Sequence, residues 1–267
     1  MQFHRTVLRA ANSIFNLVVI LLLLIAGSYS AFALWDNERI YAAAGDVQAD
    51  MIKLKPEIVL SDEEDSVADF SQLLKVNGDV CGWLTLDNTN VDYPVLQGDN
   101  NFSYINTDVY GDFSLAGSIF LDSRSSREFA DPYCLIYGHH MADNKMFGDL
   151  DLYKDEKFFQ ENTTGSLILP NKAYKLEVIA CLLVPASEDH IFEPTMWKDS
   201  NISRFLEFAE NNSLNLHDEV LAELKTAEEP FQILALSTCS YEYTDARTIL
   251  LTRMIPFSSE KLGGQSK

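Results

Sequence analysis

The sequence predicts a mainly β protein, with about eight short strands closing or nearly closing into a barrel and helices confined to the connections. Two observations carry this prediction. Short apolar runs rich in β-branched residues recur between polar or turn-forming residues, as is typical of buried strands. Apolar residues at helical spacing fall only between these runs or before them, which favours a barrel over a layered α/β fold.

The N-terminal segment indicates on which side of a membrane the protein lies. Residues 14–34 carry no charge, and a helix needs about 20 apolar residues to cross a bilayer. Arg5 and Arg9 precede this segment and Asp36 follows it, so the positive-inside rule puts residues 1–13 in the cytoplasm and the rest outside. We therefore expect a single-pass membrane anchor with an extracellular domain.

A cleaved signal peptide is the competing interpretation of the same segment. Ala31-Phe32-Ala33 has the small-x-small form of a cleavage site. The apolar run is longer than the roughly 7–15 residues usual in a signal peptide, which favours an uncleaved anchor.

The part of the chain after the anchor is strongly acidic. Of 20 basic residues only Arg5 and Arg9 precede Asp36, and none of the 40 acidic residues does. Such a surface repels nucleic acid and anionic lipid headgroups. We therefore expect no nucleic-acid partner, and contact with the membrane only through the N-terminal helix.

Beyond the anchor we expect a stalk over 35–60, one folded domain over 61–257 and a loose tail over 258–267. Ser61 and Glu64 have capping-box spacing, which predicts a packing helix that ends at Asn77-Gly78. The expected strands are 83–86, 91–96, 117–121, 133–137, 167–169, 174–184, 231–238 and 247–254. The expected helices are 101–105, 146–160, 200–211 and, as a weaker prediction, 217–225, with a polar loop over 185–195.

The last two predicted strands carry candidate catalytic residues. If they pair as a hairpin, Cys239 closes the first and Arg247 opens the second, so both lie at the same end of the sheet. A guanidinium stabilises a nearby thiolate, the nucleophilic form of cysteine. His139 follows another predicted strand and can exchange a proton with the thiol if it lies near. The alternative is a buried structural cysteine near a surface arginine.

The remaining cysteines and histidines indicate no disulfide and no cofactor. Cys81, Cys134 and Cys181 lie in apolar settings, like small core residues. The histidines at 139, 140, 190 and 217 lack metal-ligand spacing, and no C-x-x-C is present.

Four segments resemble the sortase family, closest to class B sortases. They are Val91–Gly98 (VDYPVLQG), Gly117–Asp122 (GSIFLD), Leu135–Phe147 (LIYGHHMADNKMF) and Leu236–Cys239 (LSTC). They occur in the family's order, and the similarity spans roughly residues 65–255. It implies an eight-stranded sortase barrel with an N-terminal helical extension, held by a signal-anchor helix in a Gram-positive-type membrane.

The resemblance implies a role for each candidate residue. Cys239 would be the nucleophile, His139 the general acid and base, and Arg247 the residue that stabilises the oxyanion and positions the substrate. His140 is the histidine with which His139 is most easily confused. Substrate contacts would come from Asn101, Ile105, Ser237, Thr238 and Ile191.

The implied reaction is transpeptidation. Cys239 would cleave an [L/N]PxT[G/N]-like sorting motif near the C-terminus of a secreted protein and keep the acyl group as a thioester. An amine of a cell-wall peptide, or a lysine of a pilin, would then resolve it. One departure from the family pattern is Ala235, which stands where a threonine is usual; we expect an effect on rate, not on chemistry.

Two alternatives differ in kind. L,D-transpeptidases also use histidine, cysteine and arginine, but their Ser-His-Gly-Cys core is absent here, and papain-like enzymes have cysteine before histidine. The other alternative is an inactive, membrane-tethered binding or scaffold domain with the same fold.

Overall fold

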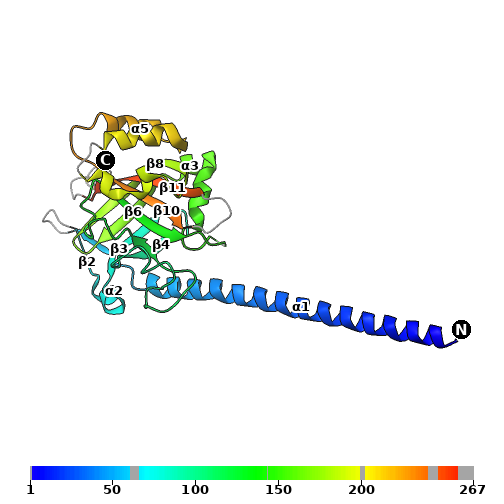
Figure 1. Ribbon diagram of the computed structural model, residues 1–267. Helices are drawn as coiled ribbons and strands as arrows, with labels where there is room; N and C mark the ends of the chain where they lie inside the picture. Colours follow the sequence, from blue (N-terminus) through cyan, green and yellow to red (C-terminus); the bar gives the residue numbers. More distant parts are fainter. Residues whose placement is uncertain (1, 61–65, 143, 199–201, 240–245, 258–267) are drawn as a thin grey trace. The chain divides into compact units, whose positions relative to one another are not determined.

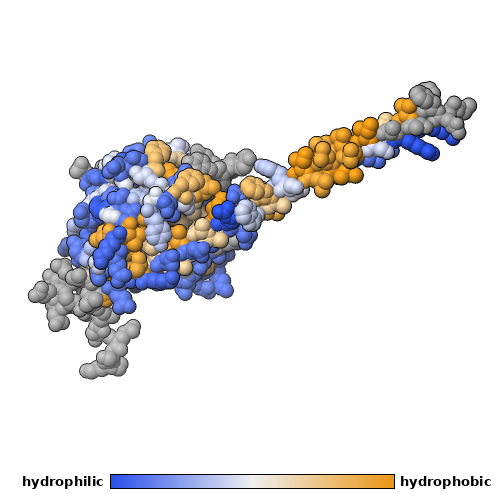
Figure 2. Space-filling view, turned by 90° about the horizontal axis from the view of Figure 1, so that it is seen from below, coloured by the Kyte–Doolittle hydropathy of each residue, from blue (hydrophilic) through white to orange (hydrophobic). Residues whose placement is uncertain are grey.

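The computed structural model describes residues 2–60, 66–142, 144–198, 202–239 and 246–257. It divides into two compact units, residues 1–43 and 44–267. The first unit is part of helix α1 (Gln2–Ile52), the one described helix that is long and apolar enough to cross a membrane by length and composition. Its large apolar side chains are exposed, and Figure 2 shows them along much of the helix.

The segment expected as a stalk is helical as far as Ile52, and from Ala44 on it belongs to the second unit. Ala44 and Met51 are buried there, and Met51 joins a cluster with Phe70 and Trp83. The chain then forms a small antiparallel pair, β1 (Ile58–Leu60) with β2 (Ser66–Ala68).

The rest of the second unit is built from short elements (Figure 1). The strands are β3 (Val80–Leu86), β4 (Asp92–Leu96), β5 (Ile119–Leu121), β6 (Tyr133–His139), β7 (Thr164–Leu169), β8 (Lys172–Pro185), β9 (Ser213–Leu216), β10 (Gln232–Cys239) and β11 (Ala246–Pro256). The helices are α2 (Ser71–Val76), the 3₁₀ helix η1 (Gly148–Lys154), α3 (Glu156–Glu161), α4 (Asp189–Phe192), the 3₁₀ helix η2 (Pro194–Trp197), α5 (Ser203–Asn212) and α6 (Asp218–Lys225).

Eight of these strands close into a mixed barrel, which confirms the predicted fold class. The order is β11-β10-β6-β5-β4-β3-β7-β8, and β8 pairs back onto β11 to close the ring, with β9 added at the side of β8. The pairs β4–β5 and β6–β10 are parallel and the others antiparallel. The predicted hairpin is present, with Gln232 opposite Met254.

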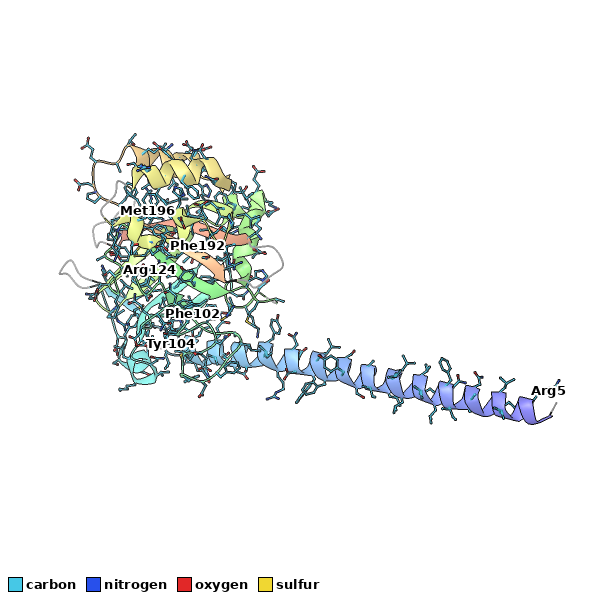
Figure 3. All side chains as sticks on the ribbon, viewed as in Figure 1. Arg5, Phe102, Tyr104, Arg124, Phe192 and Met196 are labelled. Atoms are coloured by element: carbon cyan, nitrogen blue, oxygen red, sulfur yellow. The ribbon has the colours of Figure 1, made fainter. Side chains whose placement is uncertain are left out.

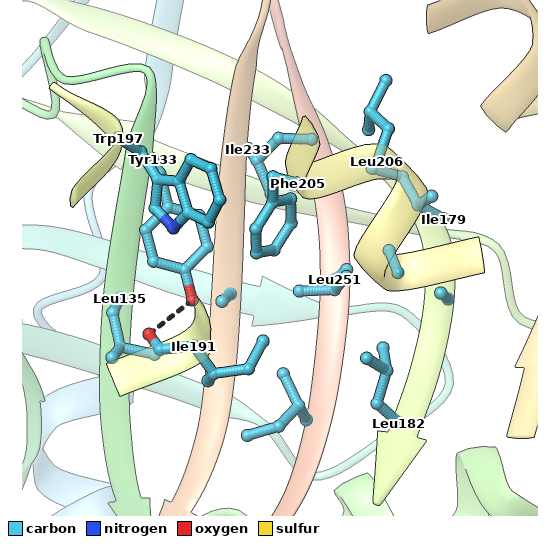
Figure 4. Close-up of a cluster of buried hydrophobic side chains, with 14 of the residues drawn as sticks. Tyr133, Leu135, Ile179, Leu182, Ile191, Trp197, Phe205, Leu206, Ile233 and Leu251 are labelled. Atoms are coloured by element: carbon cyan, nitrogen blue, oxygen red, sulfur yellow. Dashed lines mark hydrogen bonds between the residues drawn. The ribbon is translucent and has the colours of Figure 1, made fainter. Parts of the chain in front are cut away.

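Helices α4 to α6 cover the outer face of β6, β10, β11 and β8. On β10, Ile233 and Ala235 join a cluster with Phe205 of α5, while Leu234 and Leu236 are equally buried on the opposite face. Figure 4 shows this cluster, in which Tyr133, Trp197 and Phe205 pack as neighbouring rings. The site therefore stands on strands that are buried on both faces.

The structure differs from the sequence-based elements in several places. The helix expected up to Asn77 is shorter, because residues 66–68 pair with β1 as a strand; Ser61 and Glu64 lie outside the described residues. Residues 101–105 form turns, not a helix. The helix expected over 146–160 is interrupted at Asp155, whose extended backbone ends η1 and whose carboxylate caps α3. The loop over 185–195 contains α4 and the start of η2.

Candidate active site

The ends of three strands meet at one edge of the barrel. In the parallel pair β6–β10, backbone position 139 lies opposite 239, and both strands end there. β11 runs antiparallel to β10 and begins at Ala246, next to Arg247. The backbone therefore brings the positions of His139, Cys239 and Arg247 to the same edge, although the side chain of Cys239 lies outside the described residues.

His139 is held by a backbone carbonyl. Its Nε2 lies 2.7 Å from the carbonyl oxygen of Ile105, and since a carbonyl only accepts, Nε2 carries a proton. By strand alternation His139 faces the same side as Tyr133 and Leu135, which is the side covered by α4 and α5. The bond fixes the orientation of the ring and the nitrogen that carries the proton.

The Ile105 carbonyl reaches His139 because a glycine lies behind it. Gly117 has φ +58°, and a Cβ there would lie 2.3 Å from the oxygen of Ile105. Ser118 donates its backbone N–H to the carbonyl of Tyr104, which fixes the same turn. Glycine is therefore required here both for its backbone conformation and for space.

Arg247 is partly exposed at the start of β11. By alternation it faces the same side as Ile249 and Leu251, which is also the side of His139. Its Nη1 donates to the carbonyl of Ala246 at 3.3 Å. A guanidinium in this place can stabilise a thiolate or an oxyanion formed near position 239.

His140 belongs to a different set of contacts from His139. Its Nε2 lies 3.1 Å from Oδ2 of Asp151 in η1. Oδ1 of Asp151 accepts from the hydroxyl of Thr248 at 2.7 Å and pairs with Lys154 at 2.7 Å. Burial would raise the pKa of Asp151, but hydrogen bonds from His140, Lys154 and Thr248 outweigh it and leave the pKa well below its usual range.

A buried carboxylate, Asp122, joins the turn that holds Asn101 to β6, the strand that ends at His139. It is fully buried at the end of β5 and accepts from Asn101 Nδ2 at 2.9 Å and from the hydroxyl of Tyr137 at 3.0 Å. Arg124 makes a bidentate pair with it at 2.9 and 2.8 Å. Burial would raise the pKa of Asp122, but the bonds from Arg124 and Asn101 together lower it below its ordinary value.

Arg124 also reaches the α4 segment (Figure 3). Its guanidinium donates to the carbonyl of Phe192 at 2.7 Å and to the carboxylate of Glu193 at 2.8 Å. The ring of Phe192 stacks parallel to that of Tyr137. Asp122 and Arg124 thus tie the turn that holds Asn101, the strand that holds His139 and the α4 segment into one network.

The five residues expected to contact substrate differ in exposure. Asn101 and Ile105 are partly exposed. Ser237 and Thr238 are buried at 0% and 3% exposure, and the hydroxyl of Thr238 accepts from the backbone N–H of Thr248. Ile191 is fully buried in the cluster with Phe205, and its carbonyl accepts from Tyr133. Only the first two are accessible to a peptide in this conformation.

The three cysteines other than Cys239 are unreactive because they are buried. Cys81, Cys134 and Cys181 are free and buried, and burial raises the pKa of each to about 12. They are therefore protonated, unreactive thiols at neutral pH. In the described part of the chain, no cluster of three or more histidine, cysteine or acidic residues could hold a metal ion.

Sequence reasoning missed Asp122, Arg124, Tyr137 and Asp151. Asp122 and Arg124 lie directly after a predicted strand, and an acidic and a basic residue in that place were a usable signal. Asp151 gave no such signal, because its partners His140 and Thr248 lie on other elements.

Comparisons with known proteins agree with this geometry. The chain is similar to Sortase B of Staphylococcus aureus, at 28% identity over 210 residues, which is 78% of this chain and 83% of that protein. It is similar in structure to a Streptococcus pyogenes class B sortase involved in pilus biogenesis, with TM-score 0.62 and 36% identity over 70% of this chain and 97% of that one. A Staphylococcus aureus sortase B–substrate complex matches with TM-score 0.62 and 28% identity, over 71% of this chain and 85% of that one. No protein-family model matches the chain.

Gly117→Ala tests the support of His139. The new Cβ must displace the Ile105 carbonyl, so the variant should lose about 1–3 kcal/mol of unfolding free energy. In NMR spectra the Nε2 proton of His139 should exchange with water faster than in the wild-type protein. Gly111→Ala is the matched control, since Gly111 also has positive φ (+88°) but nothing within 4 Å of a Cβ. Equal behaviour of the two variants would show that Ile105 does not support His139.

Arg124→Gln tests the buried network. The carboxylate of Asp122 would lose its only bidentate partner among the described residues, which should cost about 2–4 kcal/mol in urea unfolding. Lys157→Gln is the control, because Lys157 and its partner Glu161 are mostly exposed and 3.9 Å apart. A loss for Arg124→Gln no larger than for the control would contradict a structural role for this pair.

Proposed function

Since the chain belongs to the sortase family, closest to its class B members, we propose that it is a membrane-anchored enzyme that cleaves an [L/N]PxT[G/N]-like sorting motif of secreted proteins. As a sortase it is a cysteine transpeptidase. We further propose that the acyl group passes to an amine of a cell-wall peptide or to a pilin lysine. The observation that supports the assignment of roles most directly is the in-register pairing of positions 139 and 239 at the edge where β11 begins.

In the proposed reaction, the thiolate of Cys239 attacks the carbonyl carbon of the motif's threonine. The new C–S bond forms and the peptide C–N bond breaks, while His139 gives a proton to the leaving amine. With Nε2 donating to Ile105, the proton exchanged in the reaction is the one on Nδ1. Arg247 stabilises the oxyanion. The incoming amine then attacks the thioester and gives a proton to His139; the new C–N bond forms as the C–S bond breaks, which regenerates the thiolate of Cys239 and the protonated His139.

The solvent exposure of the five candidate residues decides which of them we assign to direct contact with substrate. Asn101 and Ile105 would contact the peptide directly, since both are partly exposed and Ile105 also holds His139. Ser237, Thr238 and Ile191 are buried. We propose that they shape the site from below.

The apolar part of α1 supports a single membrane span, and the charges around it support an orientation with the N-terminus in the cytoplasm and the catalytic unit outside. Protease added to intact cells should therefore digest the catalytic unit. Complete protection, with digestion only after lysis, would contradict this orientation. Detection of a mature chain that begins after Ala33 would favour the cleaved signal peptide.

Mass spectrometry of the full-length chain with a panel of sorting-motif peptides tests the function. The expected result is an acyl adduct on Cys239 with loss of the peptide's C-terminal fragment, and Cys239→Ala should abolish both. Full cleavage by Cys239→Ala would refute the assignment. No adduct from any peptide, with the thiol titratable, would favour the inactive scaffold.

His139→Ala and His140→Ala are a matched pair within that experiment. Loss of a general acid and base typically costs at least about a hundredfold in rate, so His139→Ala should be the severe variant. His140→Ala should cause a clearly smaller loss. If His140→Ala causes the larger loss of rate, His140 and not His139 is the general acid and base.

A further inference from the structure

One carboxylate, Asp151, connects the neighbours of all three proposed catalytic residues. Its Oδ2 binds His140, which follows His139, and its Oδ1 binds the hydroxyl of Thr248, which follows Arg247. The backbone N–H of Thr248 in turn donates to the hydroxyl of Thr238, which precedes Cys239, at 3.1 Å. The chain of contacts therefore runs from the end of β6, through η1, to the start of β11 and the end of β10.

Backbone pairing alone does not hold the start of β11 on this side. Among the described residues, the last pair between β10 and β11 at this end is Ser237–Ile249, and Arg247 lies two residues N-terminal to Ile249. The start of β11 pairs instead with β8, where Arg247 lies opposite Val184. On the N-terminal side of Ile249, β11 is therefore joined to the strands that carry His139 and Cys239 by hydrogen bonds of Thr248 to Thr238 and Asp151, in place of backbone pairing.

Asp151 projects from an anchored element. Leu150 and Tyr153 of η1 are fully buried, and Asp149 accepts from the backbone N–H and the side-chain amide of Asn90 at 2.6 and 3.0 Å. A positioning group acts well only if its own support is rigid. The carboxylate is 39% exposed and is paired with Lys154, so it adds little to stability and can act chiefly through geometry.

We propose that Asp151 is a positioning residue that sets the distance between His139 and Arg247 across the end of β10, by holding His140 and Thr248 together. This inference rests on the proposed transpeptidase function. A displacement of about 1 Å in a catalytic group can cost up to about a hundredfold in rate, so a link of this kind affects turnover more than binding.

The test compares Asp151→Ala, Thr248→Val and the double variant in the full-length chain in detergent micelles, with the peptide that wild type cleaves. Each single variant should lower kcat about tenfold with KM within about twofold. Because both remove the same link, the double variant should be no worse than the worse single variant. Asp151→Asn, which keeps one acceptor oxygen, should restore part of kcat.

Glu161→Ala is the matched control, because it also removes a carboxylate that is paired with a lysine, Lys157 at 3.9 Å, but one that lies on the neighbouring helix α3. Its kcat should stay within about twofold of wild type. A wild-type kcat for Asp151→Ala would overturn the proposal, as would multiplied losses of kcat in the double variant or an equal loss for Glu161→Ala.

Alkylation of Cys239 by iodoacetamide over a pH series separates this inference from the proposed function. If wild type cleaves no peptide, the proposed function fails, but alkylation still decides on Asp151. The expected result is a pH profile of alkylation that is shifted in Asp151→Ala and unchanged in Glu161→Ala, since the environment of the thiol sets its reactive fraction. Identical profiles in all three proteins would overturn the positioning role.

Discussion

The parallel pairing of β6 with β10 is the constraint on which the candidate site depends. Parallel neighbours cannot be joined by a hairpin, so the intervening chain crosses over and supplies β7 to β9 and the helices that cover these strands. Tyr133 to Ile136 and Ile233 to Leu236 are buried on both faces, and a slip by one residue would exchange those faces. Hydrophobic packing therefore fixes the register that sets position 139 beside 239.

Most of this fold could be predicted from the sequence, because strands buried on both faces read as unbroken apolar runs. All eight expected strand segments match barrel strands, including the hairpin of 231–238 with 247–254. The helix expected up to Asn77 was wrong in extent, since pairing of residues 66–68 with β1 overrides local helical spacing. β9 was missed because Ser213–Leu216 is short and only partly buried, so its pattern is weak.

The candidate catalytic residues were predictable from motifs, whereas the groups that hold them were not. Asp151 contacts Thr248 across 97 residues of sequence, and Arg124 contacts Glu193 across 69. No local pattern encodes such contacts. The hydrogen bond between His139 and Ile105 could not be predicted from the sequence either. Its acceptor is a backbone carbonyl, and its main requirement is the absence of a side chain at Gly117.

Because β11 closes the barrel, the proposed site is complete only when the last strand has been made. β11 completes the ring by pairing with β8 and carries Arg247, and β10 with Cys239 directly precedes it. A nascent chain that ends before residue 246 therefore has an open sheet and an incomplete site, even though His139 has long been made. If the chain crosses the membrane as it is made, position 239 shares one edge of the barrel with positions 139 and 247 only after nearly the whole polypeptide has crossed.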